Sequence, residues 1–240
     1  MDERFTVEVI SQSLNPQQII YAAMHQDYAE ELVWDQRDQW PDEQNSGELV
    51  VKNLLQGNRG HYGPFEHPQI VLNFGYFPHS TMQQMRTHRN VSFDVQSFRY
   101  TGQRILEVAE GKQDLEDVFY LRPVGSYSDR QGKKYDYTAE QRQQDLDWCQ
   151  QACQRYAERV GQGLAEEHAR GLIPFDVRQH WVMSANARSL MHLLDIRGKF
   201  DVQIETRIMT ELMFTQFQQW MPEVASWYEK TRWRKGPLAP

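Results

Sequence analysis

The sequence predicts an α+β fold, with helices and strands combined in one chain of 240 residues. A largely apolar run at residues 70–77 is typical of a strand buried on both faces. Further along, Thr138 and Gln141 form a capping-box pattern that predicts a long helix reaching about His168. A chain of this length can bury a sizeable core, so we expect a single domain over residues 1–240.

The segment before the strand is predicted to be mainly helical. Alternating apolar residues indicate a short strand at 4–10, and Pro16 is suited to the first turn of a helix that continues towards residue 33. We expect a loop or a frayed helix end at 34–46. A short helix at 47–56 follows, and a glycine ends it.

The rest of the chain is predicted to alternate between helices and irregular segments. These are a helix at 81–87, a polar and aromatic stretch to residue 100, an irregular insertion at 114–137, helices at 185–194 and 202–217, and a basic, aromatic tail at 225–240. The tail is more typical of a docking or interface segment than of a nucleic-acid motif.

Composition excludes several classes of protein. The chain has 26 Lys and Arg against 33 Asp and Glu, which gives a net charge of −7. This charge argues against a protein that coats nucleic acid, so we expect no nucleic-acid partner. Its 7 Trp, 11 Tyr and 11 Phe argue against disorder. No apolar stretch approaches the ~18 residues of a membrane span. Two cysteines cannot form a disulfide scaffold, so we expect a cytoplasmic protein.

A loop rich in glycine and proline, residues 57–68, carries the first candidate site. His61, Glu66 and His67 suggest metal ligands, but Pro64 lies between them and prevents the helix that would place them on one face. We therefore predict no metal here and favour a rigid loop that presents His61 and Glu66 to a ligand.

Residues 84–100 form a second candidate site, because three arginines and two serines alternate with apolar residues that would hold the segment against the core. The planar guanidinium of arginine is suited to phosphate. The alternative is a solvated, salt-bridged loop. A phosphorylated ligand is the natural inference, although the chain has neither a P-loop nor a GxGxxG motif.

A third candidate lies within residues 186–207. On a helix, Arg188, His192 and Asp195 would fall near one face. The pattern alone fits an amphipathic helix with a polar stripe as well as it fits a site. Elsewhere, Cys149 and Cys153 lie four apart on the long predicted helix, where we expect two small buried thiols rather than a metal or redox pair.

Together these segments resemble the flavin-dependent thymidylate synthase family. Thr87-His88-Arg89, seven residues and then Ser97 resembles the family's Arg-His-Arg, seven residues, Ser motif. The loop from His61 to His67 is similar to the family's His, two residues, Pro-Phe-Glu-His. Further similarity, in the family's order, is found at 169–174, 186–197 and 203–205.

The resemblance implies reductive methylation of dUMP to dTMP. In that family 5,10-methylenetetrahydrofolate supplies the carbon, and FAD reduced by NADPH supplies the hydride. The fold implied is a central, mostly antiparallel sheet flanked by long helices, in a homotetramer whose active sites lie between subunits.

The resemblance also implies roles for residues. Positions corresponding to flavin contacts are His61, Gly63, Glu66, Thr87, His88, Arg89, Val95, Asn186, Arg188 and His192. Positions corresponding to nucleotide contacts are Gln84, Met85, Arg86, Ser97, Arg99, Arg170 and Arg197. Arg197 falls at the catalytic arginine, whose fixed guanidinium would stabilise the uracil anion that makes C5 nucleophilic. Although the net charge of the chain is negative, we expect a local basic pocket formed by six arginines: Arg86, Arg89, Arg99, Arg170, Arg188 and Arg197.

The chain departs from the family pattern at several positions. Thr87 replaces the usual first arginine, with Arg86 beside it, and Asp94-Val95 replaces Asn-Glu. His192 replaces an asparagine, and Gly63 replaces a hydroxyl residue. Thr87 and Val95 favour an alternative function, a non-catalytic regulator that binds nucleotide in a retained pocket.

Nucleophilic catalysis is not expected from any residue of these clusters. Both cysteines lie outside them, so the thiolate attack of the other class of thymidylate synthase is unsupported. Ser97 lacks an evident neighbouring base, so we expect it to bond a phosphate or carbonyl. An RNA-binding module using 84–100 and the tail is a further alternative, disfavoured by the net charge.

Overall fold

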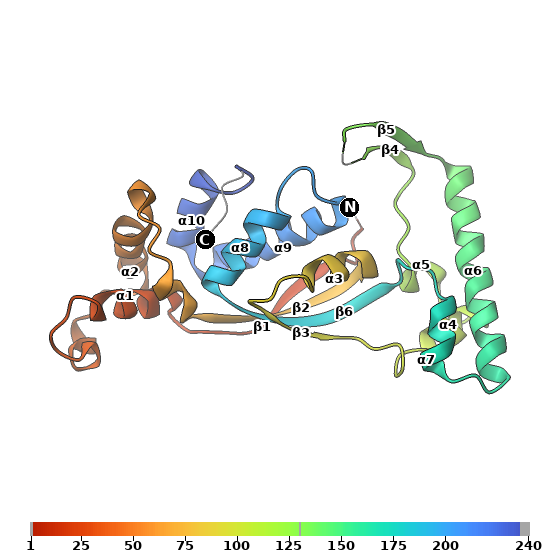
Figure 1. Cartoon of the computed structure of the whole chain (residues 1–240), viewed down its shortest axis with the longest axis horizontal. Coiled ribbons are helices and arrows are strands. Elements are labelled where there is room, and N and C mark those ends of the chain that lie inside the picture. The colour runs from red at the N-terminus through yellow and green to blue at the C-terminus, as the bar shows by residue number, and fades with distance from the viewer. Residues whose placement is uncertain (1, 130, 236–240) are drawn as a thin grey trace. The chain divides into compact units, whose positions relative to one another are not determined.

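The computed structural model describes residues 2–129 and 131–235, and it confirms the mixed helix and strand class. Strands β1 (Thr6–Gln12), β2 (Gln69–Pro78), β6 (Arg178–Asn186) and β3 (Ser92–Val95) form a sheet in that order, with antiparallel pairing (Figure 1). The described chain divides into two compact units. Unit 1 comprises residues 1–5, 75–87 and 94–181, and unit 2 comprises 6–74, 88–93 and 182–240.

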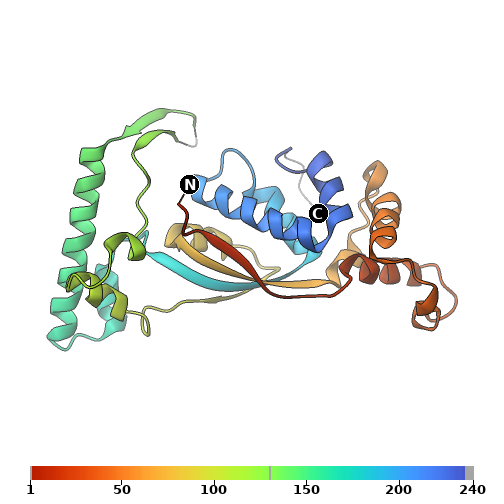
Figure 2. The same ribbon diagram turned by 180° about the vertical axis from the view of Figure 1, so that it is seen from behind.

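In unit 2 the helices α8 (Ala187–Arg197) and α9 (Ile204–Trp220) lie side by side on one face of the sheet (Figure 2). The helix α10 (Pro222–Thr231) packs against α9. Buried side chains of these helices, such as Leu194, Phe217 and Tyr228, form the core with strand residues including Leu72 and Phe74. The α8 helix, which carries several candidate residues, contacts both α9 and η4 (Gly63–Glu66).

The remaining helical elements of unit 2 lie between β1 and β2 in the sequence. They are α1 (Pro16–Gln26), η1 (Val33–Gln39), α2 (Glu43–Val50), the π-helical turn η2 (Val51–Leu55), η3 (Gln56–Asn58) and η4 (Gly63–Glu66). Gly47 of α2 lies so close to α1 that an added Cβ would stand 2.6 Å from the fully buried amide of Gln17. Only glycine allows this approach.

Unit 1 contains a second group of helices. They are α3 (His79–Met85), α4 (Gln103–Ala109), α5 (Leu115–Val118), α6 (Ala139–Gly161), α7 (Glu166–Ala169) and η5 (Arg170–Leu172), with a hairpin of β4 (Gly125–Ser128) and β5 (Lys134–Tyr137). The hairpin pairs Gly125 with Tyr137 and Ser128 with Lys134. Ile105 and Val108 of α4 pack against Cys149, Cys153 and Tyr156 of α6, so both thiols are buried as expected.

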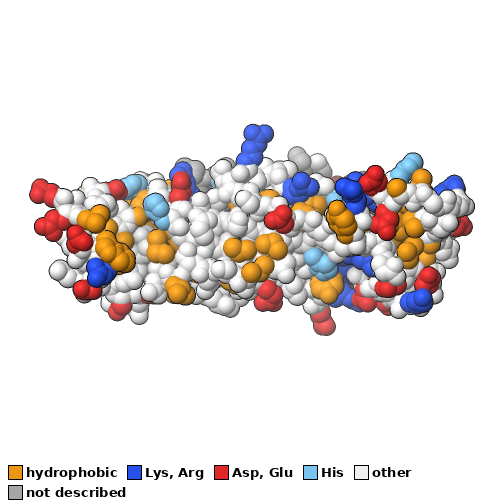
Figure 3. All heavy atoms as spheres, turned by 90° about the horizontal axis from the view of Figure 1, so that it is seen from below, with side chains coloured by type: hydrophobic (Ala, Val, Ile, Leu, Met, Phe, Trp, Pro, Cys, Tyr) orange, Lys and Arg blue, Asp and Glu red, His pale blue; other side chains and the backbone are white. Residues whose placement is uncertain are grey.

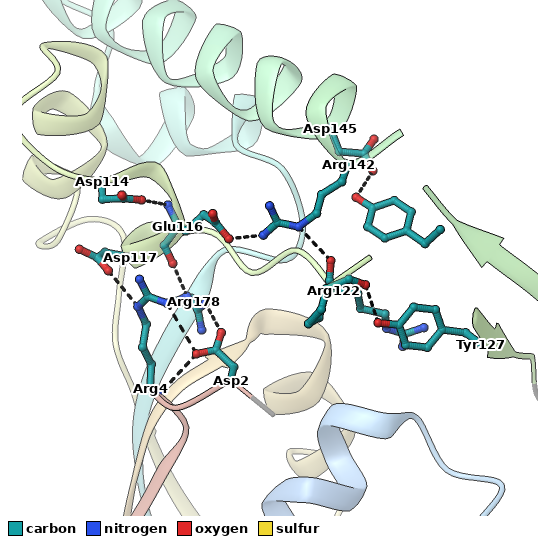
Figure 4. Close-up of polar contacts among 12 residues, drawn as sticks. Asp2, Arg4, Asp114, Glu116, Asp117, Arg122, Tyr127, Arg142, Asp145 and Arg178 are labelled. Atoms are coloured by element: carbon teal, nitrogen blue, oxygen red, sulfur yellow. Dashed lines mark hydrogen bonds and ion pairs between the residues drawn. The ribbon is translucent and has the colours of Figure 1, made fainter. Parts of the chain in front are cut away.

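A polar network joins the start of β6 to the N-terminal residues within unit 1 (Figure 4). Arg178 is 1% exposed and donates to the Asp2 carboxylate at 2.5 Å, to the Glu116 carbonyl at 2.7 Å and to the Tyr76 carbonyl at 2.9 Å. The Glu116 carboxylate pairs with Arg142 of α6. A buried guanidinium needs such partners, so this network holds the strand that leads into the first cavity described below.

Several predicted elements are confirmed. The strand at 70–77 is β2, and the helix at 185–194 is most of α8. The expected burial of the strand on both faces is wrong, because Asn73 and Tyr76 are exposed. The capping box is present, because the Thr138 hydroxyl accepts from the Gln141 N–H at 3.2 Å and the Gln141 side chain accepts from the Thr138 N–H at 2.9 Å.

Other predictions need correction. The long helix ends at Gly161 instead of near His168, and Gly163 at φ 88° turns the chain before α7. The segment at 34–46 holds η1 and the start of α2, and the insertion at 114–137 holds α5 and an ordered hairpin. Part of the tail is helix α10; residues 236–240, and Arg130 of the insertion, lie outside the described residues.

Two surface properties bear on function. Among the described residues, no helix combines the length and apolar character needed to cross a membrane. On the face drawn in Figure 3, acidic and basic side chains are interspersed, and the basic ones that are drawn form no continuous area.

Candidate active site

A cavity of about 490 Å³ in unit 1 brings together residues from three separate segments of the chain. Arg86 comes from the end of α3, Ser97 follows β3, and Arg170 begins η5. Its volume lies within the range of about 300–1,000 Å³ that is usual for small-molecule sites. Other residues that line it include His79, Val95, Gln96, Phe175 and Gln179.

Backbone hydrogen bonds fix the walls of this cavity. The first turn of α3 is tied to the segment before β6, because the His79 N–H donates to the Val177 carbonyl at 2.9 Å and the Ser80 N–H donates to the Asp176 carboxylate at 3.2 Å. The Gln96 N–H donates to the His180 carbonyl at 2.9 Å. These bonds fix the first turn of α3, which leads to Arg86, and the residue directly before Ser97.

The other predicted nucleotide residues of unit 1 have different surroundings. Met85 is fully buried and so contributes packing. Arg99 is exposed and pairs with the Glu167 carboxylate at 3.1 Å. The backbone carbonyl of Gln84, in the last turn of α3, accepts a hydrogen bond from the Thr87 hydroxyl at 2.7 Å. Val95, predicted as a flavin contact, lines the same cavity as the predicted nucleotide residues.

Unit 2 has a cavity of its own, of about 440 Å³, lined by Glu66, Asn90, Asn186, Arg188, Ser189 and His192. The Arg188 guanidinium donates to the Glu66 carboxylate at 2.5 Å, which joins α8 to η4. Asn186 caps α8 by accepting from the Ser189 N–H at 2.8 Å. Four of the predicted flavin residues therefore meet here, on the N-terminal half of one helix and the loop beside it.

Arg197 lies in the last turn of α8, where its Nε donates to Nε2 of His88 at 2.9 Å. Burial, and then the charges of Arg197 and His192, lower the pKa of His88 to about 4. A neutral imidazole can accept from a guanidinium, whereas an imidazolium has no acceptor. His88 therefore holds Arg197 in one orientation over the neutral pH range.

Asp195 of α8 does not line the unit 2 cavity. Its carboxylate is buried, accepting from the Tyr228 hydroxyl at 2.7 Å and from Arg232 at 2.8 Å. Burial, and then this carboxylate, raise the pKa of Tyr228. The three residues predicted to share one helix face therefore differ in role. Arg188 and His192 line a cavity, whereas Asp195 binds Tyr228 of α10 and Arg232 directly after it.

The remaining predicted flavin residues lie around these elements. In the loop, His61 is exposed with its Nε2 at 3.9 Å from the Asp27 carboxylate, and Gly63 begins η4, which the buried Pro64 anchors. Arg89 is exposed. No group of three or more His, Cys, Asp or Glu side chains that could hold a metal ion occurs in residues 2–129 and 131–235.

The six arginines expected to converge do not share a cavity within either unit. Arg86, Arg99 and Arg170 belong to unit 1, and the others, Arg89, Arg188 and Arg197, belong to unit 2. The unit 1 cavity is also lined by Gln96, Gln179 and His79, for which no motif predicted a role. A sequence signal for β6, which carries Gln179, was present, because the apolar residues Trp181, Met183 and Ala185 occur at every second position, as in a strand.

The fold and its cavities define an α+β protein whose unit 1 cavity carries two arginines suited to an anionic ligand. The model of the family described as "Thymidylate synthase complementing protein" matches residues 8–223. Flavin-dependent thymidylate synthases from Haloarcula marismortui and Halobacterium salinarum are 32% and 31% identical to this chain; each comparison covers 98% of the chain and 99% of the relative. The chain belongs to the flavin-dependent thymidylate synthase family.

Solved structures share the fold. A UMP/dUMP methylase, PolB, from Streptomyces cacaoi bound with 5-Br dUMP matches with a TM-score of 0.71 at 22% identity, covering 97% of both chains. Thymidylate synthase X from Helicobacter pylori, with FAD and dUMP, matches with a TM-score of 0.68 at 17% identity, covering 92% of this chain and 98% of that one. At these identities the likeness supports the fold.

Proposed function

We propose that this chain catalyses the reductive methylation of dUMP to dTMP, with 5,10-methylenetetrahydrofolate as carbon donor and NADPH as reductant. The observation that carries the proposal is the unit 1 cavity, where Arg86, Ser97 and Arg170 meet from distant parts of the sequence. Two guanidinium groups and a hydroxyl around one cavity fit a phosphate monoester.

Arg197 is the proposed catalytic residue. A guanidinium beside the uracil stabilises negative charge on the ring, which makes C5 a better nucleophile toward the methylene carbon. His88 orients the guanidinium without adding a charge of its own. Neither cysteine is among the residues that line the two cavities described above, and burial raises the pKa of Cys149 to about 11, so a thiolate nucleophile has no place in the proposed reaction.

The unit 2 cavity fits a flavin through its side chains. Arg188 and His192 offer hydrogen-bond donors, Asn186 keeps its amide N–H groups after its oxygen has capped α8, and Glu66 fixes Arg188. Bound FAD, reduced by NADPH, would supply the hydride. We propose the other flavin contacts by resemblance: His61, Gly63, Thr87, His88, Arg89 and Val95. Gln84, Met85 and Arg99 complete the proposed nucleotide contacts.

We further propose a cytoplasmic homotetramer of single-domain chains, in which residues of different subunits complete each active site. Mass measurement by light scattering tests the assembly. A monomeric protein with full activity would contradict it.

The first experiment is reconstitution of the purified chain with FAD, followed by a thymidylate-formation assay with dUMP, NADPH and methylenetetrahydrofolate. A protein that takes up no flavin would refute the proposal. Arg197→Ala should abolish thymidylate formation while FAD binding persists, and Arg155→Ala, an exposed arginine of α6, is the matched control. Unchanged turnover in Arg197→Ala would remove Arg197 from the site.

A second candidate function, a regulator that binds nucleotide without turnover, is favoured by Thr87 and Val95 at positions where the family usually has arginine and glutamate. Binding of dUMP without NADPH oxidation in the complete assay would support it over the enzyme.

A further inference from the structure

Two glutamines form a neutral polar part of the unit 1 cavity. Gln179, the second residue of β6, is 1% exposed, and Gln96 follows β3 directly. Both line the cavity that also holds Arg86 and Arg170. The cavity therefore has charged groups suited to a phosphate and, in addition, uncharged amides suited to another part of the ligand.

The amide oxygens of both glutamines are buried and have no hydrogen-bond partner. A buried acceptor without a donor destabilises a folded protein, and most such atoms in native proteins are paired. Both unpaired oxygens belong to side chains of the same cavity, which is the arrangement expected when a ligand supplies the missing donors.

A phosphate cannot supply them, because its oxygens act as acceptors near neutral pH. The donors of a uridine nucleotide are its sugar hydroxyl groups and its N3–H. We infer that Gln96 and Gln179 are specificity-determining residues that accept hydrogen bonds from these donors of the nucleoside. The inference rests on the proposed binding of dUMP in this cavity.

The test measures nucleotide binding to the full-length, FAD-loaded chain by calorimetry, for the unaltered protein and for Gln179→Met and Gln96→Met. Methionine keeps the approximate length of glutamine and removes its hydrogen-bonding atoms. Gln143→Met, at an exposed position of α6, is the matched control. Each cavity variant should bind dUMP about tenfold more weakly, the effect of one lost hydrogen bond, whereas the control should bind as before.

Analogues distinguish the two sources of donors. The analogue 2′,3′-dideoxyuridine monophosphate lacks sugar hydroxyls. If a glutamine binds the sugar, its substitution by methionine should leave the affinity for this analogue unchanged. If a glutamine binds N3–H, its substitution should leave the affinity for 3-methyl-dUMP unchanged. UMP, with an additional hydroxyl, should bind to the unaltered protein at least as well as dUMP if either glutamine accepts from the 2′ position.

Thermal unfolding without nucleotide separates recognition from a structural role. Removing an unpaired buried acceptor should leave the melting temperature of Gln179→Met unchanged or raise it, while a structural glutamine would lower it. Equal dUMP affinity in the unaltered protein and both cavity variants overturns the inference and leaves the proposed function intact. No dUMP binding by the unaltered, FAD-loaded protein overturns the proposed function and this inference together.

Discussion

Two arginine–carboxylate pairs involve α8 and differ in burial, which allows a matched test of what each contributes. Asp195 pairs with Arg232, and their side chains are 0% and 12% exposed. Glu66 pairs with Arg188, and their side chains are 51% and 32% exposed. The substitutions Asp195→Asn and Glu66→Gln each remove one negative charge with little change of shape.

The expected costs follow from burial. Removing one partner of a buried ion pair leaves the other charge uncompensated, which typically costs about 3–5 kcal/mol of the free energy of unfolding. A half-exposed pair contributes about 0–1 kcal/mol, because water and salt screen it. Asp195 also accepts from Tyr228, so Tyr228→Phe should cost a further, separately measurable ~1 kcal/mol.

Urea unfolding followed by circular dichroism measures these differences, and a double-mutant cycle of Asp195→Asn with Tyr228→Phe measures their coupling. We expect Asp195→Asn to be much the more destabilising of the matched pair. A cost below about 1 kcal/mol for Asp195→Asn, or equal costs for the two substitutions, would refute the assignment of Asp195 to a structural role between α8 and α10.

Further predictions concern the site and the thiols. The pKa of His88 is about 4 in the folded protein and about 6.5 in the unfolded chain, so the unfolded chain binds a proton more readily as the pH falls. The contribution of His88 to the free energy of unfolding should be fully present above pH 6.5 and should decrease towards pH 4. Urea unfolding at a series of pH values should show a weaker pH dependence for His88→Asn. Burial raises the pKa of Cys149 to about 11 and of Cys153 to about 12, so both should resist iodoacetamide at pH 8 until urea is added; rapid labelling of the native protein would contradict this. Ser97→Ala should raise the KM for dUMP about 3–10-fold with little change in kcat, and loss of kcat alone would instead indicate a nucleophile.

Local sequence signals predicted the elements that depend on local interactions. The capping box of α6 links Thr138 to Gln141, three residues further on, so the local sequence was sufficient to predict it. The end of the same helix was misplaced, although Gly163 is a left-handed position typical of a helix C-terminus. Strand β6 was not predicted at all. Its first residue, Arg178, is of a type usually found at the surface, and its burial depends on Asp2, 176 positions away in sequence.

The candidate site shows the same limit. Motifs identified Arg86, Ser97 and Arg170, which the fold brings to one cavity. Spacing on α8 could not separate Asp195 from Arg188, since both fit one polar stripe; the packing of α10, which supplies Tyr228 and Arg232, decides it. Sequence patterns therefore identify residues that line a cavity more reliably than they distinguish them from polar residues that pack elements together, such as Asp195.

The acidic net charge of the chain remains compatible with anionic ligands because of where its carboxylates lie. Arg99 and Arg188 are each paired with a carboxylate, from Glu167 and Glu66, and in both pairs the side chains are substantially exposed. Such pairs contribute at most about 1 kcal/mol, so a ligand phosphate can replace the carboxylate at small cost. The buried pair of Asp195 and Arg232 could not be exchanged in this way. Burial, more than net charge, thus determines which arginines are available to a nucleotide.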